Sequence, residues 1–332
     1  MNSIDAMETE IRYQVENLSK SNLPKQTNLS DCMFVGSGDS YVAALIAQYA
    51  SNHKVICCNP MDIVLNPEIV ENRRIYIVSI SGNTKANILA AKIAKEQNVR
   101  TTAITANPES KLAKNCDEIM EVQYKTTGIP TSGTISFTSS MLSCLSLVSE
   151  VNDFDNLKMI YRETKNEVES LIDDNDDDNI LENLSSYIFL GDGILFPVGI
   201  YGALKINEVF GSKSFAYPLE EFCHSPIFSI KRNDKIMILG NKEYGKRINS
   251  SNSNSKTLND RLEELDFSSC FYTNCSSSGG NKLSLTEMLL KSIFFLQLYI
   301  VKQAIIQGVK DCYFLQNKDI LKLSSFFIYD IC

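Results

Sequence analysis

The sequence predicts an α/β protein with two subdomains, each a doubly wound, mostly parallel sheet flanked by helices in three αβα layers. Short apolar runs alternate with helical stretches in the first half, which is typical of parallel strands buried on both faces. The second half repeats this alternation more weakly. A chain of 332 residues is long enough for two subdomains with cores of their own.

The first half, residues 1–152, is expected to form the first subdomain. Its strand candidates are Cys32–Val35, Lys54–Cys57, Ile75–Ile80, Thr101–Thr105 and Glu118–Val122. The helical stretches between them lie near Tyr41–Ser51, Lys85–Asn98 and Ser110–Asn115, and a longer helix from about Ser132 to Val151 closes this half.

A linker is expected over residues 153–180. It contains a helical stretch, Asp155–Ile172, and the acidic run Asp173–Asn179, whose charge repulsion suits a solvated connection.

The second subdomain is expected over residues 181–332 and looks like a duplication of the first. Two strand-and-glycine patterns of the first half recur here. The pattern Met33–Val35 with Gly36-Ser37-Gly38 recurs as Tyr187–Leu190 with Gly191-Asp192-Gly193. The pattern Ile75–Ile80 with Gly82-Asn83 recurs as Lys235–Leu239 with Gly240-Asn241. Leu239 stands where the first copy has hydroxyls, so we expect only the first half to hold phosphate. The polar stretch Gly245–Asp260 is predicted to be a mobile surface excursion, the long helix Leu285–Gln307 packs this half, and an irregular tail follows.

Two loops of the first half point to chemistry. Ser79–Thr84 joins a strand to a helix with three hydroxyls and a glycine, and the N–H groups and dipole at a helix start favour an anion. Ser81 and Thr84 could equally well only cap that helix. A second loop, Gly36–Ser40, also follows a strand, and ligands of open parallel sheets bind where two such strand ends meet.

Composition excludes several classes of function. The net charge is −8 and no lysine- or arginine-rich tract occurs, so we expect no nucleic-acid partner. The charged start and the lack of an uninterrupted apolar run of spanning length predict a cytoplasmic protein with no membrane contact. Ten scattered cysteines without zinc-finger spacing, and only two histidines, predict reduced thiols, no metal site and no cofactor.

Three residues of the second half could take part in catalysis. Lys205 and Glu208 are three apart, so on a helix they share a face and can serve one site or simply form a surface ion pair. His224 precedes Ser-Pro and could either act in catalysis or only hydrogen-bond a turn.

The motifs together resemble the sugar isomerase (SIS) domain family, specifically the two-subdomain isomerase module of glucosamine-6-phosphate synthases and the stand-alone glucosamine-6-phosphate deaminases. The resemblance spans nearly the whole chain, with both subdomains as SIS subdomains. It is carried by Gly36–Ser40, Ser79–Thr84, Ala103–Ala113, Ala203–Glu208 and Glu221-Phe-Cys-His224-Ser-Pro226.

The resemblance implies a role for each matching residue. The sugar phosphate would be held by Ser40, Ser79, Ser81, Asn83 and Thr84. Glu208 would move the proton between C1 and C2, Lys205 would lie beside the open-chain sugar, and His224 would assist ring opening from the partner subunit of a homodimer. The remaining pocket residues would be Gly38, Gly82, Thr134 and Glu221, with Lys322 as the lysine of the C-terminal tail.

These roles predict an aldose–ketose isomerase of hexose phosphates, with glucosamine 6-phosphate and fructose 6-phosphate as the first choice. The chain starts directly at the isomerase module, so we expect ammonia-dependent chemistry without a glutaminase domain. It departs from the family at Ser132-Gly133-Thr134-Ile135 and at Ser225. The alternatives are an isomerase of glucose or mannose 6-phosphate and a non-catalytic phosphosugar-binding regulator. A dinucleotide-binding fold is disfavoured because the first glycine loop lacks a third glycine.

Overall fold

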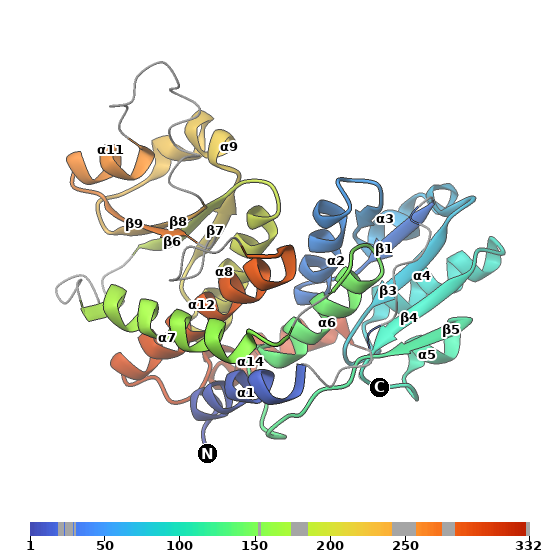
Figure 1. The fold of residues 1–332 in the computed structure, drawn as a ribbon. Coiled ribbons are helices and arrows are strands. Elements are labelled where there is room, and N and C mark those ends of the chain that lie inside the picture. The colour runs from blue at the N-terminus through green and yellow to red at the C-terminus, as the bar shows by residue number, and fades with distance from the viewer. Residues whose placement is uncertain are drawn as a thin grey trace. The chain divides into compact units, whose positions relative to one another are not determined.

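A computed structural model describes residues 1–18, 23, 29, 31–151, 154–173, 185–240, 257–273 and 283–329 (Figure 1). The chain divides into two compact units. Residues 12–152 and 314–332 form what we call the N-terminal unit, and residues 1–11 and 153–313 form the C-terminal unit. Residues 1–11 thus group with the second half of the chain, and residues 314–332 group with the first half. Helix α1 (Ser3–Asn17) contributes residues to both units.

The N-terminal unit is built on a five-stranded, fully parallel sheet in the order β2-β1-β3-β4-β5. Its strands are β1 (Cys32–Val35), β2 (Ile56–Cys58), β3 (Arg74–Val78), β4 (Thr101–Thr105) and β5 (Glu118–Glu121). Its helices are α2 (Asp39–Ala50), α3 (Pro60–Leu65), the 3₁₀ turn η2 (Pro67–Val70), α4 (Lys85–Glu96), α5 (Lys111–Asn115), α6 (Ile135–Ser146) and α14 (Lys318–Ile328).

Alternation along the strands divides this core into two layers of side chains. Ile75 and Ile77 of β3 pack with Met33 and Val35 of β1 against apolar residues of α3, α4 and α5. The opposite face carries Phe34, stacked 5.1 Å from Tyr76, and α2 and α6 pack against each other beside it (Figure 1). Helices therefore lie on both faces, which confirms the doubly wound sheet.

The C-terminal unit repeats the topology with a four-stranded parallel sheet in the order β7-β6-β8-β9. Its strands are β6 (Ser186–Gly191), β7 (Ser214–Tyr217), β8 (Asp234–Gly240) and β9 (Ser268–Thr273). Its helices are α7 (Leu157–Asp173), α8 (Leu195–Phe210), α9 (Leu219–His224), the 3₁₀ turn η4 (Pro226–Ser229), α11 (Leu258–Glu264) and α12 (Leu285–Ile306), with α13 (Tyr313–Gln316) at the unit boundary.

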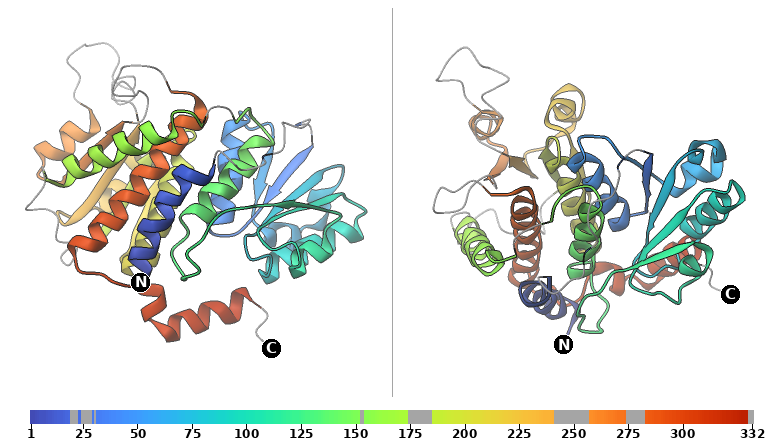
Figure 2. Two further views of the ribbon diagram at one scale, coloured as in Figure 1. Left: turned by 60° about the horizontal axis from the view of Figure 1, so that its bottom comes forward. Right: turned by 45° about the vertical axis from the view of Figure 1, so that its right-hand side comes forward.

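Helix α12 is the central helix of this unit. It packs against both α7 and α8, as the left view of Figure 2 shows for α7. Its length and apolarity would suffice to cross a membrane, but 83% of its most apolar window is buried inside the protein. Within the described residues it is therefore a core helix.

The predicted duplication is confirmed by backbone geometry. A side chain at Gly36 would lie 2.6 Å from the backbone of Ser40, and one at Gly191 would lie 2.8 Å from the backbone of Leu195. Two residues later, Gly38 and Gly193 adopt φ of 56° and 55°. Both glycine loops thus make the same turn from strand into helix.

Several predicted bounds differ from the structure. The second strand begins at Ile56 and not at Lys54, and the C-terminal tail is not irregular because α14 forms within it. Most of the acidic run after Asp173 and most of the polar stretch from Gly245 lie outside the described residues.

Candidate functional site

The Ser79–Thr84 loop, here called the phosphate loop, is folded by its own side chains. The Ser79 hydroxyl accepts a hydrogen bond from the Gly82 N–H at 3.2 Å and lies 3.5 Å from the Thr84 hydroxyl. Ser79 is buried and Ser81 is exposed. The Ser81 hydroxyl accepts from the Asn83 N–H at 3.3 Å. The structure therefore brings these predicted phosphate ligands together in one tight turn.

The start of helix α4 distinguishes between capping and anion binding. Thr84 occupies the N-cap position, yet no side chain makes a capping hydrogen bond there. Ser81 bonds to Asn83, which precedes the helix. By contrast, Ser110 caps α5 by accepting from the Ala113 N–H at 3.2 Å. The start of α4 thus has no side-chain cap, which is typical of a helix start that binds an anion.

Gly82 sets the shape of the phosphate loop. Its φ is +63°, and a Cβ atom there would lie 2.0 Å from the Ser110 hydroxyl. The Gly82 carbonyl accepts from the Leu112 N–H at 2.9 Å, which ties the loop to α5. Ser110 was not predicted as a residue of the site, although the Asn-Pro-Glu-Ser stretch before α5 is typical of a capped helix start.

The glycine loop after β1 lies beside the phosphate loop because β1 and β3 are neighbours and the strand order reverses there. Gly38 is the N-cap of α2, again without a side-chain capping bond, and Ser40 lies in the first turn. A Cβ at Gly133 would lie 2.5 Å from the Asp39 carboxylate, so the loop before α6 adjoins this turn. Thr134, fully buried, is the N-cap of α6 and also makes no capping bond.

The C-terminal helix α14 adjoins the phosphate loop within the same unit. Lys85 Nζ donates to the Phe326 carbonyl at 3.0 Å, and Thr84 forms an isolated β-bridge with Tyr329. Lys322 lies exposed on this helix. The tail lysine is thus carried by a helix whose end is bound beside the phosphate loop.

In the C-terminal unit, α8 holds Lys205 and Glu208. Lys205 is only 1% exposed, and its Nζ lies 2.6 Å from Glu208 Oε2 and 5.4 Å from the centre of the Tyr201 ring. The Glu208 side chain is 37% exposed. A buried ammonium needs a partner, so this pair is not the surface ion pair that the sequence left open.

Helix α9 carries Glu221 and His224, both exposed. His224 Nε2 lies 3.4 Å from Glu220 Oε1 one turn earlier on the same helix. The structure thus pairs His224 with Glu220 and leaves its side chain 70% exposed.

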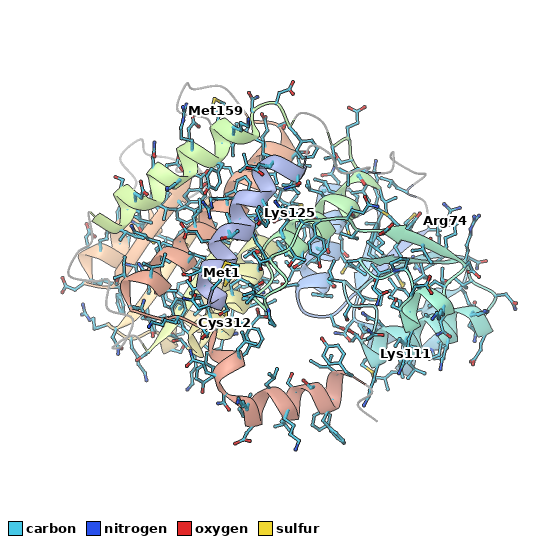
Figure 3. The ribbon with its side chains drawn as sticks, turned by 90° about the horizontal axis from the view of Figure 1, so that it is seen from below. Met1, Arg74, Lys111, Lys125, Met159 and Cys312 are labelled. Carbon is cyan, nitrogen blue, oxygen red and sulfur yellow. The ribbon has the colours of Figure 1, made fainter. Side chains whose placement is uncertain are left out.

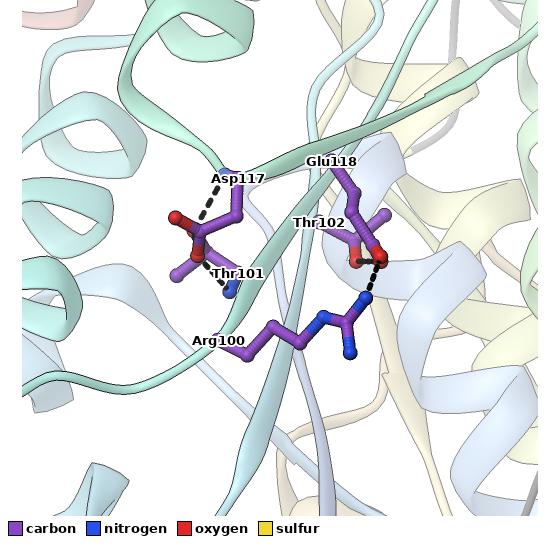
Figure 4. Close-up of polar contacts among 5 residues, drawn as sticks. All are labelled: Arg100, Thr101, Thr102, Asp117 and Glu118. Carbon is purple, nitrogen blue, oxygen red and sulfur yellow. Dashed lines mark hydrogen bonds and ion pairs between the residues drawn. The ribbon is translucent and has the colours of Figure 1, made fainter.

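A cavity of about 640 Å³ lies elsewhere in the N-terminal unit, against β3, β4, β5 and α6. Its lining includes Arg74, labelled in Figure 3, together with Tyr76, Thr102 and Ser139, and it contains none of the predicted site residues. Beside it, the Thr102 hydroxyl donates to Glu118 at 3.1 Å, and Arg100 pairs with the same carboxylate (Figure 4). These contacts join β4 to β5 and are structural.

Potential metal ligands do not cluster in the described part of the chain. Among the residues that the structure describes, no group of three or more His, Cys, Asp or Glu side chains could hold a metal ion.

Comparison with known proteins identifies the first unit. Residues 30–149 match the family model of the SIS domain. The chain is 26% identical over 227 residues to a glutamine–fructose-6-phosphate aminotransferase from Sulfurisphaera tokodaii, covering 65% of this chain and 37% of that protein. A protein of the same name from Clostridium tetani is 25% identical over 68% of this chain and 40% of its own length. The matched part spans well under half of these curated relatives.

Solved structures share the fold over nearly the whole chain. Glucosamine-6-phosphate deaminase from Thermotoga maritima matches with a TM-score of 0.68 at 21% identity, covering 93% of this chain and 94% of that one. The C-terminal domain of the aminotransferase from Francisella tularensis matches with 0.68 at 20% identity, covering 91% and 96%. Tagatose-6-phosphate ketose/aldose isomerase from Escherichia coli matches with 0.64 at 18% identity, covering 92% and 90%.

Proposed function

Residues 30–149 match the model of the SIS domain, and on that premise we propose that the chain is a sugar isomerase that interconverts the aldose and ketose forms of a hexose phosphate. Glucosamine 6-phosphate and fructose 6-phosphate are the proposed pair, because the fold is shared with a glucosamine-6-phosphate deaminase. The observation that carries the proposal is the phosphate loop itself, which gathers the hydroxyls of Ser79, Ser81 and Thr84 at the N-terminus of α4.

The phosphate dianion would replace the missing cap of α4. Its oxygens would accept hydrogen bonds from the N–H groups of the first turn and from the hydroxyls of Ser79, Ser81 and Thr84, with the helix dipole favouring the charge. Ser40 at the neighbouring start of α2 would supply a further hydroxyl, and Asn83 an amide. Gly38, Gly82 and Thr134 would shape the walls of this site.

Glu208 would serve as the base once the sugar ring has opened. In the aldose direction its carboxylate takes the proton from C2, and the C2 electron pair forms the enediol or, for an amino sugar, the enolamine. The proton then returns to C1. For glucosamine 6-phosphate, the resulting ketimine takes up water and releases ammonia to give fructose 6-phosphate. The Lys205 ammonium, 2.6 Å away, orients the Glu208 carboxylate.

His224 would deliver a proton to the ring oxygen as the bond from that oxygen to C1 breaks, while the C1 hydroxyl gives up its proton to form the aldehyde. Its side chain is 70% exposed, as a group offered to a second copy of the chain would be. We therefore propose a homodimer in which one subunit's His224 completes the other's site, with Glu221 nearby and Lys322 contributed by the tail.

The test is a substrate panel. The protein is incubated with glucosamine 6-phosphate, with fructose 6-phosphate plus ammonium, and with glucose and mannose 6-phosphate. We expect turnover of the first two. Turnover of only glucose or mannose 6-phosphate would indicate an isomerase of neutral hexose phosphates. This is the second candidate function, and the fold shared with the tagatose-6-phosphate isomerase favours it.

The variant Glu208→Gln separates an enzyme from a phosphosugar-binding regulator. We expect it to abolish turnover while hexose-phosphate affinity, measured by calorimetry, changes by less than about threefold. Undiminished turnover would refute Glu208 as the base, and binding without turnover by the unaltered protein would indicate a regulator.

A further inference from the structure

Helix α9, which carries His224, has no cap of its own. It begins after Pro218, whose side chain cannot hydrogen-bond to the helix N–H groups. Instead, Asp192 Oδ1 accepts from the Leu219 N–H at 3.0 Å. Asp192 belongs to the glycine loop after β6, 27 residues earlier in the chain. The helix start is thus held by a side chain from another element.

The N-terminal unit provides an internal comparison. Helix α3 follows β2 there as α9 follows β7, since both strands occupy the same edge of equivalent sheets. Asn59 caps α3 by accepting from the Met61 N–H at 3.0 Å, and Asp62 completes a capping box. The backbone of the two N-cap residues is nearly the same, with φ and ψ of −77° and 144° at Asn59 and −57° and 144° at Pro218.

The loop that holds α9 is the counterpart of the glycine loop beside the phosphate loop. Gly191 and Gly193 reproduce the turn of Gly36 and Gly38, and Asp192 stands in the place of Ser37. A carboxylate at this position would repel a phosphate. Asp192 instead accepts a hydrogen bond from the first residue of α9.

We propose that Asp192 is a positioning residue that fixes α9 and thereby places His224 for ring opening. This inference rests on the function proposed above. A helix of only six residues is marginal without tertiary contacts, so its first hydrogen bond matters more than in a long helix. His224 is the last residue of α9, and Glu220, its ion-pair partner, lies on the same helix. The imidazole therefore moves with the α9 backbone.

The first experiment measures hydrogen exchange of the α9 amides, which needs no activity. Asp192→Ala is expected to speed exchange by about fivefold, the effect of losing one cap, while Asp192→Asn keeps an acceptor and stays within about twofold of the unaltered protein. The double variant Asp192→Ala/Pro218→Asn copies the cap of α3, with Glu221 in the place of Asp62, and should restore slow exchange. Pro218→Asn alone is the matched control.

The second experiment connects the anchor to catalysis through His224. Asp192→Ala should lower kcat by about tenfold with KM within about twofold, since a misplaced group costs rate more than binding. It should have no further effect in a His224→Ala background. Pro218→Asn should rescue kcat in the Asp192→Ala protein.

The outcomes are separable. Unchanged exchange in Asp192→Ala overturns the anchor, whatever the activity. Faster exchange with unchanged kcat, or additive losses with His224→Ala, overturns the positioning role. If the unaltered protein turns over no hexose phosphate, the proposed function fails and the positioning role fails with it, while the exchange data still decide whether Asp192 anchors α9.

Discussion

Replacing Gly82 by alanine should disrupt the phosphate loop, and the structure sets the size of the effect. At φ +63° an alanine costs about 1–2 kcal/mol from the left-handed conformation alone. Its Cβ would also lie 2.0 Å from the Ser110 hydroxyl and 2.4 Å from the Ser110 Cβ. Rotating the hydroxyl away would not remove the second contact, because Cβ moves only with the backbone.

Relieving that overlap adds further costs. Shifting Ser110 strains a packed site by about 1–3 kcal/mol and gives up its capping bond to Ala113, worth about 1 kcal/mol. We therefore expect Gly82→Ala to destabilise the N-terminal unit by about 3–6 kcal/mol. Gly38→Ala is the matched control: its φ is +56°, but a Cβ there meets no atom within 4 Å. With ψ at −130° its backbone lies outside the left-handed helical region, so this substitution should cost about 1–3 kcal/mol from backbone strain alone.

The assay is hydrogen exchange as a function of urea, read on peptides from β3 and β4, so that the N-terminal unit is followed separately. Hexose-phosphate binding is measured on the same variants by calorimetry. We expect Gly82→Ala to lose binding even where the unit remains folded. Equal destabilisation by the two substitutions would refute the close contact with Ser110, and unaltered binding would refute the phosphate loop as the ligand site.

Three further predictions concern charges and thiols. Glu167→Gln leaves Lys291, which is 3% exposed and 2.8 Å from that carboxylate, without its ion pair and should cost about 3–5 kcal/mol in urea unfolding. The hydrogen bond from the backbone N–H of Thr101 lowers the pKa of Asp117 in the folded protein. The Asp117 carboxylate therefore stabilises the fold at a pH above its pKa in the unfolded chain, and this stabilisation is lost as the pH falls through its pKa in the folded protein. Asp117→Asn should remove this loss of stability at acid pH, which thermal unfolding between about pH 2 and 7 measures. Burial raises the pKa of Cys58 to about 12, so iodoacetamide at pH 8 should leave it unmodified in peptide mass mapping.

The sheets could be predicted from the sequence because their strands are continuous apolar runs. Ile75–Val78 is buried on both faces and is apolar throughout. Thr101–Thr105 is equally buried, and its β-branched threonines favour a strand. The edge strand Ser214–Tyr217 was missed because it is short and partly exposed. Helix α14 was missed although Ile320, Leu323 and Phe327 recur at helical spacing, and the structure leaves these three side chains exposed.

Some residues of the candidate site could be predicted from the sequence, and others could not. The phosphate loop could be predicted because its residues are consecutive and its chemistry is local. The burial of Lys205 could not, since spacing along α8 shows only that Lys205 and Glu208 share a face and says nothing of what covers it. The hydrogen bond from the Leu219 N–H to Asp192 could not be predicted either. It joins the start of α9 to a loop 27 residues earlier and depends on the order of β6 and β7 in the sheet.

The side chains beside the helix starts distinguish the two copies of the fold. Helix α2 and its counterpart α8 both lack a side-chain cap, so the missing cap alone does not separate the copies. The N-terminal copy differs in the hydroxyls of the phosphate loop, which lie beside the start of α4. In the other copy the glycine turn is kept, but Asp192 brings a carboxylate of the protein itself to the next helix. A ligand anion would meet repulsion there and attraction in the first copy. We therefore expect the phosphate of the substrate to bind to the N-terminal unit.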